Sequence, residues 1–148
     1  MPWTHDSERI FDPDEAHNLR RKRQRDTADS ILARADFLPP PDRTLILAVY
    51  EDSRPVADLA RMMGRDPRAL RRRIRRLVER MVSPRFAFVA ARRDQWSSTR
   101  RRVATACVLH GLSLRAASDQ LGLSHYTVRR HCQIIDALVE ASRSWKHR

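Results

Sequence analysis

Residues 68 to 76 carry the densest set of side chains in this sequence that could do chemistry. Six of these nine residues are arginine. Guanidinium groups match the geometry of phosphate oxygens and of the O6 and N7 atoms of guanine. On a helix, most of these arginines lie opposite the apolar stripe that begins at Leu70. The candidate site is this arginine face with its flank: Arg68, Arg71, Arg72, Arg75 and Arg76.

So many arginines on one helix face favour contacts with phosphates, with one or two base contacts among them. Two alternatives stay open: a solvated helix face, and a docking surface for an acidic partner protein. We expect contact with DNA or RNA, because the face belongs to the last helix of a unit described below.

A second candidate helix, expected over residues 125–141, has a different character. Its two arginines and two carboxylates cancel in formal charge. Its candidate site residues are the polar side chains on and beside the outward face: Tyr126, Thr127, Arg129, Arg130 and Gln133. Arginine and glutamine can make two-point contacts with guanine and adenine, and tyrosine and threonine can reach a phosphate or a thymine methyl group. We expect this helix to read base sequence while the arginine-rich helix supplies affinity.

Catalytic and metal chemistry are not expected. His125 and His131 are six residues apart, a spacing that does not put two ligands on one helix face as a four-residue spacing does. Cys107 and Cys132 fall on apolar positions of the repeat described next, so we expect small buried hydrophobic residues there. No carboxylates cluster as a nuclease metal site requires. The sequence therefore predicts no enzyme, no metal and no cofactor.

The two candidate helices belong to two copies of one unit. Residues 45–81 align with residues 103–139 at a constant offset of 58 without a gap, and Gly64 falls on Gly122. Identity is low, but the apolar positions coincide, which indicates a duplicated supersecondary structure. Each copy predicts three helices, at about 43–52, 56–63 and 67–82 and then at about 98–110, 114–121 and 125–141.

Each shared glycine falls in the turn before the third helix, where a left-handed backbone favours glycine. This order of elements is the helix-turn-helix layout, in which the last helix enters the major groove of DNA. The chain has only three glycines, too few for a fold rich in tight β-turns. The sequence therefore predicts an all-α fold: tandem three-helix helix-turn-helix units preceded by an N-terminal helix.

Four segments follow from this pattern. They are an N-terminal charged helix at 1–37, a first helix-turn-helix at 38–82, a linker at 83–97 and a second helix-turn-helix at 98–148. In the linker, Ser83-Pro84 ends the preceding helix. Residues 85–89 then form either a short strand, for which no partner strand is evident, or an extended apolar plug.

The N-terminal helix is expected to start at Asp12-Pro13 and to run to about Asp36. Pro39-Pro40-Pro41 then forms a stiff connector, and a new helix starts after Asp42.

The charge distribution also points to a polyanion. The chain has 148 residues, with 30 basic and 18 acidic side chains and a net charge of +12. Residues 1–60 carry 9 basic and 12 acidic side chains, whereas residues 61–148 carry 21 and 6. A GC-rich genome would explain why 28 of the basic residues are arginine, but not why the excess lies in one part. We expect a basic binding surface there.

Membrane insertion and secretion are not expected. No apolar run approaches the ~20 residues that a membrane helix needs. Asp6 and Glu8 stand where a signal peptide would be apolar. We expect a cytoplasmic protein.

The entry into the first unit resembles a known family. Leu38-Pro39 is followed by Asp42-Arg43, an apolar helix, Val56-Ala57-Asp58-Leu59-Ala60 and Met63-Gly64. This series resembles the C-terminal, region 4-like domain of bacterial RNA polymerase sigma factors, over about residues 38–82, with a weaker echo at 103–139. The resemblance implies a cytoplasmic bacterial module whose helix-turn-helix reads a promoter element. We expect a duplicated domain without the larger sigma domain that binds polymerase.

These features together predict a sequence-specific protein that binds double-stranded DNA, a bacterial transcriptional regulator. Two rivals stay open: a module that docks on RNA polymerase or an anti-sigma factor, and the DNA-binding part of a recombinase or transposase. Ile134 and Leu138 project away from the core stripe of their helix. They either pack on the N-terminal helix or form a homodimer face.

Overall fold

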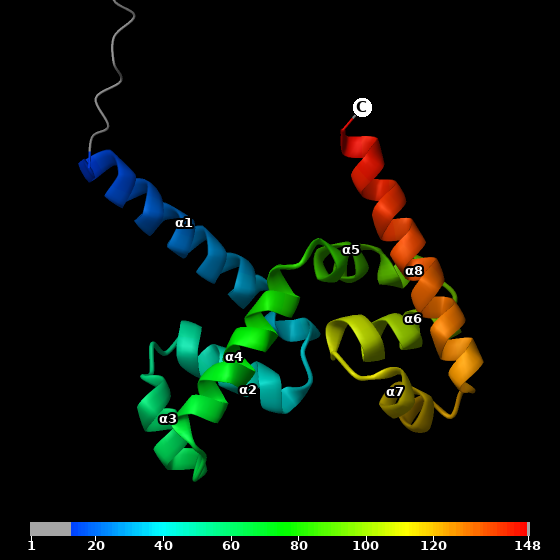
Figure 1. Ribbon diagram of the computed structural model, residues 1–148, viewed down its shortest axis with the longest axis horizontal. Coiled ribbons are helices and arrows are strands. Elements are labelled where there is room, and N and C mark those ends of the chain that lie inside the picture. Colours follow the sequence, from blue (N-terminus) through cyan, green and yellow to red (C-terminus); the bar gives the residue numbers. More distant parts are fainter. Residues whose placement is uncertain (1–12, 148) are drawn as a thin grey trace, which may run out of the picture.

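The computed structural model describes residues 13–147, and every regular element within that range is helical. The expected cap Asp12 and the acidic residues Asp6 and Glu8 lie outside the described residues. The all-α fold is confirmed (Figure 1). The helices are α1 (Pro13–Arg34), α2 (Pro40–Tyr50), α3 (Val56–Met63), α4 (Pro67–Val82), α5 (Pro84–Arg92), α6 (Ser98–Ala104), α7 (Leu114–Leu121) and α8 (His125–Lys146).

Three short turns complete the chain path. Two 3₁₀ turns, Ala35–Phe37 and Arg93–Gln95, follow α1 and α5. A π-helical turn, Thr105–Leu109, extends α6.

The proline connector after α1 is shorter than the sequence indicates. Only Pro39 is extended, and α2 begins at Pro40 rather than after Asp42. The first turn of a helix needs no backbone N–H donors, so Pro40 and Pro41 fit there without loss.

The predicted turn glycines are confirmed in both copies. Gly64 ends α3 with φ 61° and Gly122 ends α7 with φ 65°, both in the left-handed region. Two residues later a polar side chain caps the next helix. Asp66 Oδ2 accepts a hydrogen bond from the backbone N–H of Ala69 at 3.0 Å, and Ser124 Oγ accepts one from Thr127 at 3.1 Å. The long helix of each copy thus starts from the same kind of turn.

The segment predicted as a strand or an extended plug is a helix. Ser83 Oγ accepts a hydrogen bond from the backbone N–H of Phe86 at 3.2 Å, and Pro84 occupies the first turn of α5. Phe86 and Val89, one turn apart, are fully buried. Both expected alternatives were wrong because Ser83-Pro84 ends α4 and also starts α5.

Two small cores fill the two copies and correspond position by position. The first holds Leu45, Leu59, Leu70 and Ile74, together with Ala60. The second holds the residues 58 positions later, which are Val103, Ala117, Val128 and Cys132, together with Ala106. Residues that the predicted alignment pairs are therefore buried in both copies.

A larger core joins the two copies around α5. It contains Phe86 and Val89 from α5, with Leu77 and its counterpart Ile135. Ile31 of α1 lies in the same cluster. The two copies are thus parts of one packed body.

Polar contacts also surround this core. Arg85 Nε lies 2.8 Å from Asp136 Oδ1, and Arg34 Nη1 donates to the Met81 carbonyl at 2.6 Å. The Arg93 guanidinium lies 5.2 Å from the ring centre of Phe37.

The N-terminal helix and α8 pack on different neighbours. Helix α1 packs against α2 and α4, whereas α8 packs against α5, α6 and α7 (Figure 1). Ile134 and Leu138 are half-buried, and α1 is not their main neighbour. The homodimer face stays a prediction. Within residues 13–147, no helix has both the length and the apolar character that crossing a bilayer requires.

Candidate nucleic-acid interface

The arginines of α4 divide into a paired inner set and an unpaired outer set. Arg73 Nη2 lies 2.7 Å from Asp42 Oδ1, and Arg80 Nη2 lies 3.9 Å from Asp42 Oδ2. The side chains of the five predicted site residues have no hydrogen bond or ion pair to any described residue, and all five are exposed: Arg68, Arg71, Arg72, Arg75 and Arg76. The outer arginines therefore have no carboxylate partner among residues 13–147.

The apolar stripe of α4 fixes which way these arginines face. Leu70, Ile74, Leu77 and Met81 are buried, at spacings of three and four residues. The cap at Asp66 sets the start of the helix and hence its register. The predicted opposition of apolar and basic faces is confirmed by this burial.

The inner arginines belong to the structure. Arg80 is partly buried, and desolvation lowers its pKa, while the charge of Asp42 raises it in compensation. Arg73 and Arg80 both face α2, where Asp42 sits in the first turn. These contacts hold α4 against α2 and leave the outer face free.

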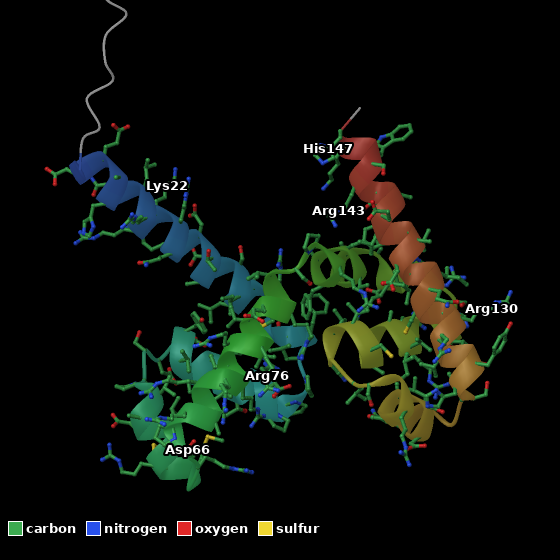
Figure 2. All side chains as sticks on the ribbon, viewed as in Figure 1. Lys22, Asp66, Arg76, Arg130, Arg143 and His147 are labelled. Carbon is green, nitrogen blue, oxygen red and sulfur yellow. The ribbon has the colours of Figure 1, made fainter. Side chains whose placement is uncertain are left out.

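The polar face of α8 lies mostly open to solvent. Tyr126 is 71% exposed, and Arg129, Arg130 and Gln133 are also exposed without a hydrogen bond to the described residues. Arg130 points away from the rest of the molecule (Figure 2). The buried stripe of α8 consists of Val128, Cys132, Ile135 and Val139.

Thr127 differs from the other predicted site residues. It is half-buried, and its hydroxyl lies 2.8 Å from Ser124 Oγ. Because its N–H also bonds to Ser124, Thr127 belongs to the cap of α8. Its methyl and hydroxyl groups are less available to a ligand than the sequence suggests.

The turn between α3 and α4 adds a basic residue that the sequence reasoning missed. Arg65 follows Gly64 directly and is exposed, and its side chain has no partner among the described residues. It stands beside the start of α4. Its position immediately after the turn glycine is the signal that could have identified it.

The two long helices are oriented alike in one respect. Their amino-terminal ends, marked by Asp66 for α4, both lie at the lower side of the view (Figures 1 and 2). The carboxyl ends of both helices rise toward the upper side.

The histidines and cysteines of the second copy form no metal cluster among residues 13–147. Cys132 is buried and Cys107 is half-buried, and both are free thiols. A hydrogen bond between the two side chains and burial raise the pKa of Cys107. Burial is the main cause that lowers the pKa of His131, and Arg100 and Arg130 add to it.

Comparisons with known proteins add no relative: no family model, no curated protein and no solved structure matches this chain. The likeness to sigma factors therefore rests on the residues of the first copy alone.

Proposed function

We propose that this protein binds double-stranded DNA in a sequence-specific manner and acts as a bacterial transcriptional regulator in the cytoplasm. Its two copies act as helix-turn-helix units, with α4 and α8 as the helices that enter the major groove. The observation that carries the proposal is the outer arginine face of α4, whose five members lack any partner among the described residues.

The lack of partners on the outer face of α4 contrasts with the inner arginines of the same helix, which are paired. The arginines of α4 that serve the fold have a carboxylate within reach, as Arg73 does at Asp42. An outer face left without carboxylates keeps its charge for a polyanion such as DNA. Only Glu79 interrupts the face, and it is itself exposed.

We further propose that the two helices divide the work of binding. Helix α4 contacts phosphates and supplies affinity for any sequence. Helix α8 offers Arg130 and Gln133, which suit guanine and adenine edges. Tyr126 and Arg129 flank them for phosphate or thymine contacts, and Arg65 extends the basic surface of the first copy.

One observation favours a second candidate, a module that docks on RNA polymerase or an anti-sigma factor. Met62 is 70% exposed and Met63 is 44% exposed at the end of α3. Exposed methionines are typical of adaptable protein-binding surfaces.

Binding to a random duplex across a range of salt concentrations tests the proposal. Each phosphate contact contributes about −0.9 to the slope of log K against log salt, so four or five contacts give a slope of about −4. A measurable affinity with this slope supports the proposal. No binding at low salt would contradict it and favour the docking module.

Selection from random duplexes then tests whether binding is sequence-specific. Enrichment of one site is expected. An unenriched pool from a protein that binds random DNA well would restrict the function to non-specific binding.

A further inference from the structure

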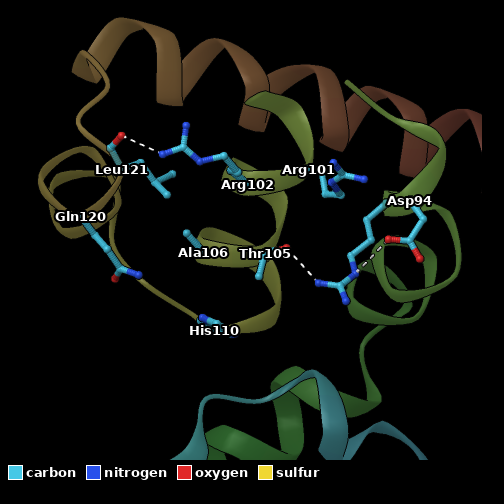
Figure 3. Close-up of a pocket in the computed structure, with 9 residues that line it drawn as sticks. Asp94, Arg101, Arg102, Thr105, Ala106, His110, Gln120 and Leu121 are labelled. Atoms are coloured by element: carbon cyan, nitrogen blue, oxygen red, sulfur yellow. Dashed lines mark hydrogen bonds and ion pairs between the residues drawn. The ribbon is translucent and has the colours of Figure 1, made fainter. Parts of the chain in front are cut away.

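A basic cleft lies in the second copy, outside the proposed reading face of α8 (Figure 3). Its walls come from α6, α7, the turn Arg93–Gln95 and the π-helical turn Thr105–Leu109. The cleft has a volume of about 360 Å³, within the range of small-molecule sites. Its polar lining includes Arg93, Arg101, Arg102, Thr105, His110 and Gln120.

Cations dominate this cleft. Three guanidinium groups and an imidazole line it, against the single carboxylate of Asp94, whose side chain is 81% exposed. The Arg101 side chain is exposed and has no hydrogen bond or ion pair to the described residues. Among the described residues, the positive charge of the lining is therefore only partly neutralised.

In two of the arginines, one guanidinium nitrogen donates a hydrogen bond to the fold. Arg93 Nη1 donates to Thr105 Oγ1 at 3.0 Å, and Arg102 Nη2 donates to the Leu121 carbonyl at 3.1 Å (Figure 3). Arg93 Nε is buried without a hydrogen-bond acceptor, and its nearest carboxylate oxygen, on Asp94, is 3.8 Å away. Fixed guanidinium groups with unused N–H donors are suited to a multivalent anion.

The π-helical turn shapes one wall. The backbone N–H of His110 donates to the Thr105 carbonyl at 2.9 Å, which closes the wide turn and sets both residues at the cleft. Such turns are rare inside helices and often lie at functional sites. Burial is the main cause that lowers the pKa of His110; Arg80 and Arg93 add to this shift, and Asp42 opposes it.

We propose that this cleft binds a small molecule that carries a diphosphate group. Arg93, Arg101 and Arg102 contact the phosphate oxygens, and Thr105, His110 and Gln120 add neutral hydrogen bonds. A single phosphate would leave much of the cleft unfilled. Arg93 also lies over Phe37, which packs against the core that joins the copies, so an occupant is connected to that core. This proposal does not rest on DNA binding.

Calorimetric titration of the full chain with inorganic pyrophosphate at low salt tests it. We expect saturable binding of one pyrophosphate per chain. Arg101→Gln removes one cleft cation that supports nothing else in the fold, and should weaken binding about tenfold, the effect of one charge-assisted hydrogen bond. Arg115→Gln removes the same charge from an exposed residue of α7 that does not line the cleft, and should bind as the wild type does.

Helix content by circular dichroism should be equal in all three proteins. No saturable binding, or equal weakening in both variants, would overturn the proposal. So would a third pattern, in which pyrophosphate does not bind but Arg101→Gln lowers the salt slope for random DNA. That pattern would assign the cleft to the DNA backbone, and it leaves the proposed function standing.

Discussion

Helices α4 and α8 have equivalent positions in the two copies but expose different chemistry. Leu70 and Ile74 of α4 are buried like Val128 and Cys132 of α8, 58 residues later. Outside this stripe, α4 carries unpaired arginines, whereas α8 carries a mixed surface with its own carboxylates. Burial therefore constrains one face of each helix, and the outer faces of the two helices are free to differ in chemistry.

The copies also differ in how they are held. In the first copy, Asp42 holds α4 through Arg73 and Arg80. In the second copy, Asp136 of α8 pairs outward with Arg85 of α5. Helix α5 thus connects α8 to the large core. A substitution in α5 is therefore the most direct test of whether the two copies unfold as one unit.

Replacement of Phe86 by alanine should have the largest effect. Phe86 is fully buried in the core that joins the copies, so the change should cost about 3–5 kcal/mol of unfolding free energy. Urea unfolding followed by circular dichroism should show one transition, because both copies lose the same core. Phe88→Ala, at a half-buried position on the same helix, should cost less. Separate transitions for the two copies would break the picture of one body.

Replacement of Gln133 or Arg130 by alanine tests the reading role of α8. Each change should cost about 1–3 kcal/mol on the selected site and little on random DNA, because directional base contacts are lost. Fluorescence anisotropy with both duplexes measures the difference. Gln24→Ala, which removes an exposed glutamine of α1, is the control. Equal losses on both duplexes would remove the distinction between the two helices.

Replacement of Gly64 or Gly122 by alanine compares the two turns directly. A Cβ atom would meet nothing within 4 Å at either position, so only the left-handed backbone is penalised. Each change should cost about 1 kcal/mol of unfolding free energy. Urea unfolding of both variants should give similar values. A clear inequality would show that the turns are not equivalent.

The smallest expected effect is the pH dependence from His110. Its pKa is lowered in the folded protein by burial, Arg80 and Arg93, so below about pH 6.5 the unfolded chain binds more protons than the folded one. Stability should therefore fall as the pH decreases through this range. Urea unfolding at several pH values should show a smaller loss of stability at low pH in His110→Gln. His125→Gln, at an exposed position, should lose as much stability as the wild type does. If the pH dependence of stability in His110→Gln equals that of the wild type, His110 is not the source of this dependence.

Much of the fold was predictable because its signals are local. The apolar spacing and the glycines at 64 and 122 predicted the bounds of α3 and α7 correctly, residue for residue. Helix α5 was missed although Ser83-Pro84 is a helix-start signal, because the same pair also ends α4.

The candidate site was predictable only in part. The helical period separated basic from apolar faces on α4, and the exposure of its arginines follows from that. The pairing of Arg73 with Asp42 depends on how α2 packs on α4, and the two residues are 31 positions apart in the sequence. The cleft draws residues from α6, α7 and two turns, so no spacing in the sequence marks it.

The central claim is that the outer arginines of α4 bind DNA phosphates whatever the base sequence. The direct measurement is the slope of log K against log salt for random DNA, compared between the wild type and the double variant Arg72→Ala/Arg76→Ala. We predict a slope smaller by about two units, one for each lost phosphate contact, with unchanged stability. Arg92→Ala/Arg143→Ala, which removes the same charge from exposed residues beside the end of α8, should keep the wild-type slope. An unchanged slope in the α4 variant would contradict the account and assign the basic face to a protein partner.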